Sequence, residues 1–524
     1  MSENLWTFLE GHAGQTPEKT LARYRDGEES YAGFVASAER AANALYGLGV
    51  RDGDNVCVML GNHPDHLHVW FGLARLGAVA VPINVHLKGE GLGYILEHSE
   101  AKLSIVEAEL VERVLALPSL PPALATIAVR GGAPPARRCL DWGALAAAAW
   151  PASPPAATPP EAVAAILYTS GTTGPSKGVM LSHAAYLNSA RAFAEEMVHA
   201  TPDDVFFTTL PLFHINAQAH TVLPAIYLNA TLAISPRFSA SGFWEEIRRS
   251  RATIFNSLAA MLPILCKQPP SPDDRRHGAR LTACAATPRD VWLQFEERFG
   301  VTIVEGYGLT ETAGFCVTNP LDEIRVGSIG KAMSWVETRV VDAADREKPI
   351  GEVGEIAIRP RAPHVLMEGY YKMPEQTAET MRGGWFHSGD AGFADADGYL
   401  GFVDRIKQSI RRRGENVSSW EVEKIVNAHP KVLESAAVGV PSELGEEDVK
   451  ICVVARPGET IDPLEIVQWC ETRMAYFMVP RYVAQYESLP KTATERVEKY
   501  KLKQEGVAEA WDREVAGYRV RRSS

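Results

Sequence analysis

Long apolar runs are absent from this sequence of 524 residues. Hydrophobic residues make up 46% of it, yet no window offers the roughly 18 consecutive apolar residues that a spanning helix needs. The opening stretch, MSENLWTFLEGHAG, carries acidic side chains and lacks a basic start followed by an apolar core. We therefore expect neither a membrane span nor a secretory signal.

Cysteine is sparse and irregularly spaced. The chain has seven cysteines, and none stands in a CxxC pair or at the Cys/His spacing of a zinc site. An odd number without ligand spacing argues against a disulfide framework and against structural zinc, and it favours a reducing compartment. The sequence thus predicts a cytoplasmic protein.

Positive charge is in deficit. Lysine and arginine total 53 against 65 acidic residues, which gives a net charge of −12. A general nucleic-acid binder needs the opposite balance, although a local basic cluster can still hold a phosphate. The length also exceeds what one hydrophobic core usually organises, so we expect two or more domains.

The pattern of strands and helices changes along the chain. Strands alternating with amphipathic helices recur through about residue 330, which is typical of a parallel α/β sheet. Short strands with turn signals follow, and residues from 418 onward form a compact α+β unit, so the simplest boundary lies near Asp404. Residues 116–160 are rich in proline and alanine and predict a surface excursion or linker.

One segment has the composition of a phosphate-binding loop. Residues 164–183, AAILYTSGTTGPSKGVMLSH, place an apolar strand before a run of glycines and hydroxyl residues that Lys177 closes. Exposed backbone N–H groups, hydroxyl donors and one ammonium are what an anionic phosphate chain requires. The spacing is not that of a Walker loop, because Ser176 and Gly178 flank the lysine.

This segment resembles the phosphate-binding motif of the acyl-adenylate-forming enzymes, which include acyl-CoA synthetases, adenylation domains of peptide synthetases and luciferases. Further matches follow in the order of that family and cover nearly the whole chain: LGAVAVPIN (76–84), LPLFHINAQ (210–218), GYGLTET (306–312), GEVGEIAIR (351–359), GWFHSGD (384–390), GYLGFVDRIKQSI (398–410) and LPKTATERVEK (489–499). SIRRRGENVSSWEVE (409–423) most resembles ligases of the carnitine and crotonobetaine type.

The resemblance implies a fold with a large N-terminal α/β domain, in which stacked sheets with helices carry a small β-barrel-like subdomain, and a mobile α+β C-terminal domain. The expected bounds are 1–403 for the first domain, 404–407 for the hinge and 408–524 for the second. Lys407 matches the hinge position about which the small domain rotates.

The resemblance also implies an ATP site. Tyr307 matches a residue that stacks on adenine, Asp390 matches a residue that accepts hydrogen bonds from the ribose, and Glu311 matches the residue that holds Mg²⁺. By composition alone GYGLTET is a strand-to-loop transition, and an isolated Asp at a turn is a structural Asx turn. The nucleotide-binding residues expected are Thr169, Ser170, Gly171, Thr172, Thr173, Gly174, Lys177, Tyr307, Gly308, Thr310, Asp390 and Arg405.

The acyl pocket is expected around His214, which matches an aromatic or histidine position at the pocket floor. A lone histidine between apolar residues is equally consistent with a satisfied core histidine. The other residues expected there are Ile215, Ala286, Thr287 and Gly308. The usual glycine-rich text at the pocket wall is replaced here by Ala285, Ala286 and Thr287, which leaves the pocket depth open.

Two segments of the C-terminal domain depart from simple expectation. Arg411, Arg412 and Arg413 could meet the phosphates of CoA, or they could be solvated. The family text normally reads Gly-Lys where this chain has Glu495 and Arg496, and that lysine bridges the substrate carboxylate and the α-phosphate. Arginine keeps the charge but is bulkier and differently hydrated.

The function implied is ATP-dependent activation of a small or medium carboxylic acid as acyl-AMP, with loss of pyrophosphate and then thioester formation with CoA. The catalytic residues expected are Lys177, Thr310, Glu311 and Arg496. A divergent member could instead activate another oxyanion such as nitrite, or pass the adenylate to a carrier thiol or an amine. A nucleotide-binding protein without catalysis is the third possibility. We expect no nucleic-acid partner, and a homodimer is possible.

Overall fold

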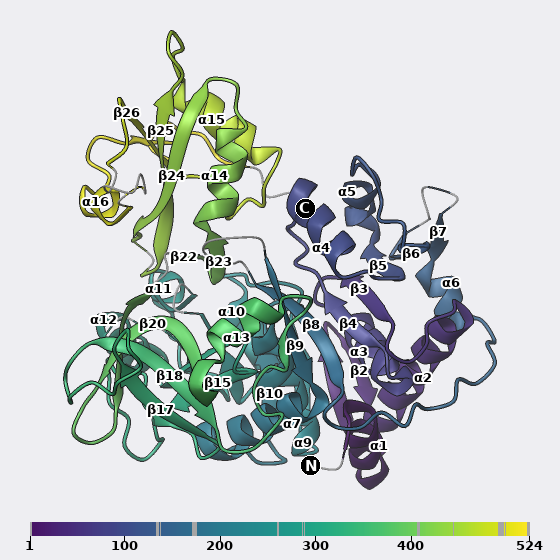
Figure 1. Ribbon diagram of the computed structural model, residues 1–524. Coiled ribbons are helices and arrows are strands. Elements are labelled where there is room, and N and C mark those ends of the chain that lie inside the picture. The colour runs from purple at the N-terminus through teal and green to yellow at the C-terminus, as the bar shows by residue number, and fades with distance from the viewer. Residues whose placement is uncertain are drawn as a thin grey trace.

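The computed structural model describes residues 3–132, 136, 138–169, 176–258, 261–285, 287, 289–405, 409–443, 445–490, 497 and 499–520. Within these residues the chain forms a large N-terminal α/β domain and a smaller C-terminal domain, as predicted. Figure 1 shows the C-terminal domain, in yellow and light green, standing on one side of the larger domain with β22 and β23 at the junction.

Two large sheets make up the body of the N-terminal domain. The described strands of the first follow the order β19-β9-β8-β4-β3-β5-β6-β7, and those of the second β16-β15-β14-β13-β12-β10-β11-β1-β2. The first contains β3 (Asn55–Met59), β4 (Val79–Pro82), β5 (Leu103–Glu107), β6 (Thr126–Arg130), β7 (Cys139–Asp141), β8 (Val163–Thr169), β9 (Lys177–Ser182) and β19 (Gly369–Tyr370). The second contains β1 (Thr20–Tyr24), β2 (Gly27–Ser30), β10 (Val205–Thr208), β11 (Thr231–Ile234), β12 (Ile254–Asn256), β13 (Leu281–Cys284), β14 (Thr302–Leu309), β15 (Gly314–Thr318) and β16 (Lys331–Ala332).

Most neighbouring strands of these sheets run parallel, which confirms the α/β pattern read from the sequence. One buried cluster joins residues of both sheets and of the helices between them. The helices of this domain are α1 (Leu5–Gln15), α2 (Tyr31–Gly47), α3 (Pro64–Leu76), α4 (Gly89–His98), α5 (Val111–Leu115), α6 (Trp142–Ala147), α7 (His183–Ala192), α8 (Ile215–Ala217), α9 (Leu223–Tyr227), α10 (Phe243–Ser250), α11 (Met261–Cys266), α12 (Arg289–Phe299) and α13 (Pro374–Thr380), with short 3₁₀ or π turns at Ala108–Leu110, Phe193–Met197, Gln218–Val222 and Arg382–Gly384.

The expectation of a linker over residues 116–160 was wrong for its central part. Strand β6 pairs with β5 in parallel, β7 pairs with β6, and α6 follows with Trp142 buried. The two strands have only five and three residues. Their alternation is too short to stand out from the surrounding proline and alanine, and the pairing with β5 decides their structure.

A four-stranded antiparallel sheet follows the second large sheet. Its order is β17-β18-β20-β21, with β17 (Val336–Val341), β18 (Gly354–Pro360), β20 (Phe386–Ala394) and β21 (Leu400–Arg405). These are the short strands that the turn signals after residue 336 predict. Strand β20 carries Asp390 to Tyr307 on β14 of the second large sheet.

The C-terminal domain is built on one mixed sheet. Its described order is β24-β25-β26-β27, and β22 pairs with β23 in a separate hairpin. The elements are β22 (Ser409–Arg412), β23 (Glu415–Ser418), α14 (Ser419–Asn427), β24 (Val432–Pro441), β25 (Glu447–Ala455), α15 (Pro463–Glu471), β26 (Tyr482–Tyr486), α16 (Lys499–Gln504) and β27 (Trp511–Asp512). Separate buried clusters cover the two faces of the sheet.

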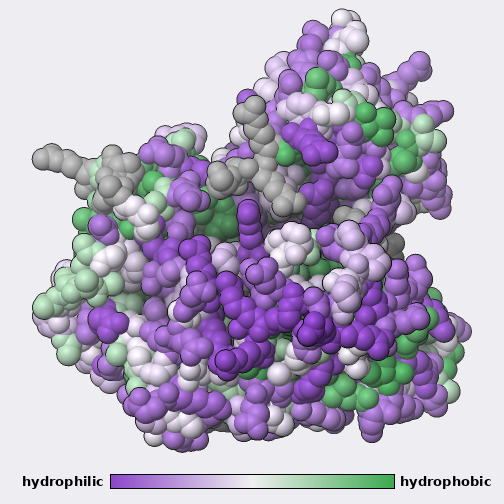
Figure 2. All heavy atoms as spheres, turned by 180° about the vertical axis from the view of Figure 1, so that it is seen from behind, coloured by the Kyte–Doolittle hydropathy of each residue, from purple (hydrophilic) through white to green (hydrophobic). Residues whose placement is uncertain are grey.

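The face of the molecule opposite the view of Figure 1 is mainly polar. Figure 2 shows hydrophilic residues over most of the face seen from behind. Among the described helices, none is both long and apolar enough to cross a bilayer. All seven cysteines are free and buried.

Three buried histidines make stability depend on pH. Burial lowers the pKa of His66 and His183 to about 4 and that of His220 to about 3. A ring nitrogen of His183 accepts the N–H of Leu5, and one of His220 accepts the N–H of Phe315. Protonation at those nitrogens would break these bonds and leave a charge in the core.

Because these folded-state pKa values lie below the unfolded value near 6.5, the stabilisation is complete above about pH 6.5 and is lost as pH falls toward 4. Moving from pH 7 to pH 5 is expected to lower the free energy of unfolding by about 2 kcal/mol per buried histidine. Urea unfolding at the two pH values measures this difference. The His220→Gln variant should show a smaller difference by about 2 kcal/mol, and an unchanged difference would contradict the assignment.

Candidate active site

Strands β8 and β9 flank the predicted phosphate loop. They pair antiparallel, with Thr169 opposite Lys177, and the Thr169 hydroxyl donates to the Lys177 carbonyl at 3.5 Å. The pairing brings the two ends of the loop together. The predicted loop residues Ser170, Gly171, Thr172, Thr173 and Gly174 lie outside the described residues.

Lys177, Tyr370 and Glu311 form one cluster beside this loop. The Lys177 Nζ lies 4.5 Å from the centre of the Tyr370 ring, and the Tyr370 hydroxyl donates to Glu311 Oε1 at 2.9 Å. Burial and the nearby Glu311 carboxylate raise the pKa of Tyr370, so its hydroxyl remains a donor. Strand β19 brings Tyr370 here by pairing with β9.

Strand β14 ends with Gly308 and Leu309 paired to β15, and Thr310 and Glu311 follow outside the sheet. A Cβ at Gly308 would lie 1.9 Å from the carbonyl oxygen of Gly314 on β15, so this close approach of two strands requires glycine. Thr310 then begins a turn in which its carbonyl accepts the N–H of Ala313 at 2.9 Å. The turn sets Thr310 and Glu311 side by side, both half-buried.

Tyr307 of β14 and Asp390 of β20 form a second contact. The Tyr307 hydroxyl donates to Asp390 Oδ2 at 2.7 Å, and both residues are buried. Burial and the Asp390 carboxylate raise the pKa of Tyr307 well above its usual value. Tyr307 of the second large sheet thus holds Asp390 of the four-stranded sheet, and the Asp390 carboxylate can accept further hydrogen bonds.

A single carboxylate at Glu311 fits a magnesium ion that is held largely by substrate. The part of the chain described here contains no group of three or more His, Cys, Asp or Glu side chains that could hold a metal. Magnesium bound with a nucleotide typically uses one or two carboxylates together with phosphate oxygens. Glu311 would supply the protein oxygen beside the phosphate loop.

His214 does not lie in a core. Its side chain is 39% exposed. The residue immediately precedes α8, which begins at Ile215, and the centres of the His214 and Phe213 rings are 4.7 Å apart. This exposure excludes the alternative of a satisfied core histidine, and the place of His214 at an acyl pocket stays a prediction.

Thr287 stands at the other predicted wall of the acyl pocket. Its N–H donates to the Glu305 carboxylate at 3.2 Å, and its buried hydroxyl oxygen makes no hydrogen bond with the described residues. Ala286 lies outside the described residues.

The C-terminal domain reaches this region through Glu415. Its Oε2 lies 3.2 Å from His214 Nε2 and 3.3 Å from Asn84 Nδ2. Burial acts to raise the pKa of Glu415, but the charge and hydrogen bond of His214 outweigh it and hold the pKa below its usual value. The two domains are therefore joined by a partly buried acid–imidazole pair.

A second contact between the domains involves the phosphate loop itself. Ser176 Oγ donates to Glu421 Oε1 on α14 at 2.9 Å. Burial raises the pKa of Glu421, and the hydrogen bond from Ser176 offsets only part of that effect. A carboxylate therefore stands next to Lys177, where the resemblance places the phosphates of ATP.

Several predicted positions of the C-terminal domain remain predictions. Lys407 and Arg496 lie outside the described residues, as does Glu495. The backbone of Arg405 pairs with Asp390 across β20 and β21, while its side chain is not described. Lys499 is held inside the domain, since its Nζ donates to Ser419 Oγ at 2.8 Å.

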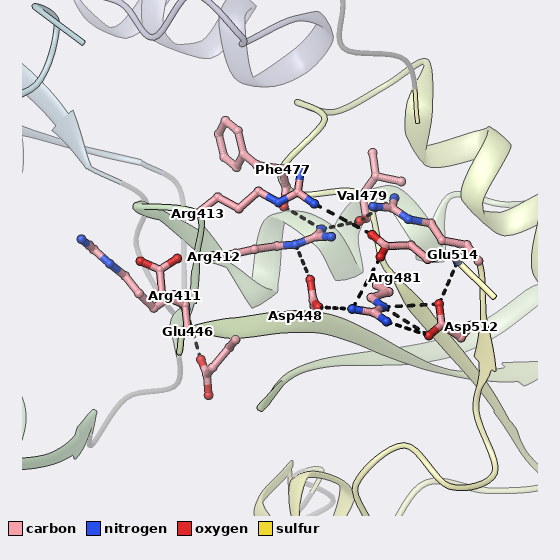
Figure 3. Close-up of polar contacts among 12 residues, drawn as sticks. Arg411, Arg412, Arg413, Glu446, Asp448, Phe477, Val479, Arg481, Asp512 and Glu514 are labelled. Carbon is pink, nitrogen blue, oxygen red and sulfur yellow. Dashed lines mark hydrogen bonds and ion pairs between the residues drawn. The ribbon is translucent and has the colours of Figure 1, made fainter. Parts of the chain in front are cut away.

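The three neighbouring arginines have different surroundings (Figure 3). Arg412 turns into the C-terminal domain, is 1% exposed and pairs with Asp448. It is therefore neither solvated nor available to CoA. The side chain of Arg413 is 35% exposed, and its Nη2 lies 3.9 Å from Glu514 Oε1. The side chain of Arg411 points away from those of Arg412 and Arg413.

Sequence reasoning missed Tyr370, Glu415 and Glu421. Tyr370 belongs to a two-residue strand, and nothing in EGYYK marks it as a site residue. Glu415 and Glu421 lie within the segment that resembles the carnitine-type ligases, but their partners are more than 200 residues away. Only the folded arrangement of the two domains brings these pairs together.

Comparisons with known proteins agree with this architecture. The family model described as AMP-binding enzyme matches residues 9–371, and the model described as AMP-binding enzyme C-terminal domain matches residues 421–496. A curated relative, a crotonobetaine/carnitine–CoA ligase of Salmonella typhi, is 35% identical over 96% of this chain and 99% of its own length.

Two solved structures extend the comparison. An anthranilate CoA ligase in complex with anthranoyl-AMP has a TM-score of 0.74 at 28% identity, and the match covers 96% of this chain and 97% of that one. An o-succinylbenzoate CoA synthetase of Bacillus subtilis has a TM-score of 0.84 at 23% identity and covers 97% and 100%. The second likeness shows the fold alone.

The fold and the two residue clusters at Glu311 and Asp390 thus define an adenylate-forming ligase with a large N-terminal and a small C-terminal domain. The chain belongs to the AMP-binding enzyme family, which confirms the resemblance seen in its motifs. It is an AMP-forming ligase of the acyl-CoA synthetase type.

Proposed function

We propose that the enzyme converts a small or medium carboxylic acid to its acyl-AMP and then to its CoA thioester. The observation that carries this proposal is the pairing of two clusters. Lys177, Tyr370 and Glu311 stand at the phosphate loop, and Tyr307 with Asp390 stands where a ribose would follow.

In the first half-reaction a carboxylate oxygen of the acid attacks the α-phosphorus of ATP, and the bond to the β-phosphate breaks to release pyrophosphate. Lys177 and Thr310 would face the charge that grows on the phosphate oxygens. A magnesium ion bound at Glu311 would neutralise part of that charge. Asp390 would hold the ribose hydroxyls and so orient the α-phosphate.

In the second half-reaction the CoA sulfur attacks the acyl carbon, and the bond to AMP breaks. The domain contacts described above suit this step, since Glu415 meets His214 while Glu421 occupies the edge of the phosphate loop. Glu421 accepts the hydroxyl of Ser176 at that edge, and in its ionised form it would oppose the phosphates of ATP. The arrangement is therefore one that forms after pyrophosphate has left.

Rotation of the C-terminal domain would then exchange the two arrangements, with residues 404–407 as the hinge and Lys407 at its pivot. The role of Arg496 in place of the family lysine is part of this proposal. Its guanidinium keeps the positive charge that would bridge carboxylate and α-phosphate during adenylation. The free cysteines favour a cytoplasmic setting.

Pyrophosphate release tests the proposal. The panel contains carnitine and crotonobetaine, because the curated relatives are named for them, together with other short acids, nitrite with an aryl amine, and no acid. Release with a carboxylic acid followed by thioester formation is expected. Release only with nitrite and amine would favour diazotisation, and nucleotide binding without any release would favour a protein that does not catalyse.

His214 is expected to affect which acid is preferred. Its exposed ring borders the predicted pocket and is held by Glu415, so His214→Ala should enlarge the pocket and change the ranking of acids about tenfold, with little change in the KM for ATP. The ratio of kcat/KM for two acids of different length measures this. A change in stability alone, with the same ranking, would contradict the assignment.

A further inference from the structure

The hairpin of residues 409–418 carries Glu415 to the N-terminal domain. Its turn holds Arg413 and Gly414 in left-handed conformations with φ of 52° and 80°. A Cβ added to Gly414 would lie 2.1 Å from Leu258 Cδ1 of the N-terminal domain. The hairpin therefore fits closely against the other domain, and a small tilt would move Glu415 away from His214.

Three consecutive acids fix the hairpin to its own domain. Glu446, Glu447 and Asp448, which we call the acidic triplet, lead into and begin β25. Glu446 accepts the N–H of Gly414 at 3.0 Å and Glu447 accepts the N–H of Arg411 at 3.1 Å. Asp448 accepts the Nε–H of Arg412 at 2.9 Å. The hairpin is thus held through the backbone and side chain of β22 and through the backbone of its turn.

Arg412 is the buried centre of this attachment (Figure 3). Its Nη1 donates to the carbonyls of Phe477 and Val479 at 3.0 and 2.7 Å. Asp448 also accepts from Arg481 at 3.0 Å, and Arg481 pairs with Asp512 at the same distance. Because a guanidinium is a planar fork, these acceptors fix the direction of the side chain as well as its position.

A buried ion pair is a poor means of gaining stability, because the cost of removing two charges from water offsets most of their attraction. Such pairs are better suited to fixing one arrangement of the groups that they join. Here the pair of Arg412 and Asp448 fixes the position of the hairpin. The same hairpin carries Glu415, which contacts His214.

We propose that Arg412 is a positioning residue for thioester formation. By holding the hairpin on the acidic triplet, it sets Glu415 at the distance that meets His214 when the C-terminal domain faces the acyl pocket. Arg412 itself touches no substrate. The inference rests on the proposed function, since thioester formation is the step that it serves.

The test compares the two half-reactions in Arg412→Met and Arg412→Lys. Transfer from preformed acyl-AMP to CoA should fall about a hundredfold in Arg412→Met, as expected for a small misplacement, whereas acid-dependent pyrophosphate release should stay within about twofold. Arg412→Lys should recover part of the transfer rate, because the ammonium can still reach Asp448. Lys431→Met, which removes an ion pair with Glu465 elsewhere in the domain, is the control.

Glu446→Ala provides a second variant that does not disturb the buried arginine. Glu446 is half-buried and its carboxylate accepts the N–H of Gly414 in the turn, so folding should persist while transfer falls about tenfold. Equal losses in both half-reactions of these variants, or unchanged transfer in both, would overturn the proposal.

Hydrogen exchange separates this inference from the proposed function. In Arg412→Met and in Glu446→Ala the amides of residues 409–418 should exchange at least about tenfold faster, since their acceptors are lost or released, and those of the N-terminal sheets should not change. If no acid supports pyrophosphate release in the unaltered enzyme, the proposed function fails while this measurement still decides on the anchoring. Unchanged exchange in both variants would overturn the anchoring itself.

Discussion

Replacing Glu311 by Gln is expected to lower acid-dependent pyrophosphate release by about a hundredfold or more, the size of effect that follows loss of one charged group facing the transition state. The carboxylate is fixed by the Tyr370 hydroxyl at 2.9 Å, and glutamine can keep that hydrogen bond while losing the charge. The loss should therefore reflect the missing ligand for Mg²⁺ rather than a disturbed site.

The measurement is a magnesium titration of the pyrophosphate-release rate. Glu311→Gln should require more magnesium and should remain slow at saturation. Glu368→Gln is the control, because its neighbour Met367 donates its N–H to the Glu311 carbonyl while the Glu368 carboxylate pairs with His364 at 3.0 Å. Unchanged turnover in Glu311→Gln would remove the metal assignment.

Replacing Asp390 by Asn is expected to raise the KM for ATP by about ten- to a hundredfold. A hydrogen bond to a charged acceptor is worth about 1.5–3 kcal/mol, and Asp390 is 2% exposed beside Tyr307. Tyr307→Phe removes only the hydroxyl that donates to Asp390 and should raise the KM about fivefold.

Comparison of ATP with 2′-deoxy-ATP shows whether the effect arises at the ribose. The unaltered enzyme should prefer ATP, and Asp390→Asn should lose most of that preference. Asp395→Asn, which alters an exposed ion pair with Arg325, should keep it. A preference that survives in Asp390→Asn would assign the ribose to another residue.

Motif order in the sequence predicted the family and the fold class, because close approaches of backbone to backbone and of backbone to phosphate demand particular residues. Gly308 is such a position, since a Cβ there would collide with Gly314. The strands of residues 126–141 were missed because their pairing partner, rather than their own composition, determines them.

The candidate site was predicted less completely than the fold. The sequence pointed to Lys177, Glu311 and Asp390, but it did not predict that Tyr370 connects the first two. It also left the arginines 411–413 between two alternatives. For Arg412, burial against Asp448 excludes both solvation and contact with the phosphates of CoA, since neither solvent nor CoA can reach its guanidinium.

The sequence by itself thus determined the class of enzyme and the order of its elements and predicted a phosphate loop, because these depend on residue types at local spacings. The tertiary structure alone decided which distant side chains share a charge or a hydrogen bond. Glu415 reaches His214 and Glu421 reaches Ser176 across a domain boundary. Such contacts depend on the packing of whole domains, and no local pattern of residues encodes the distance between two side chains that lie more than 200 positions apart.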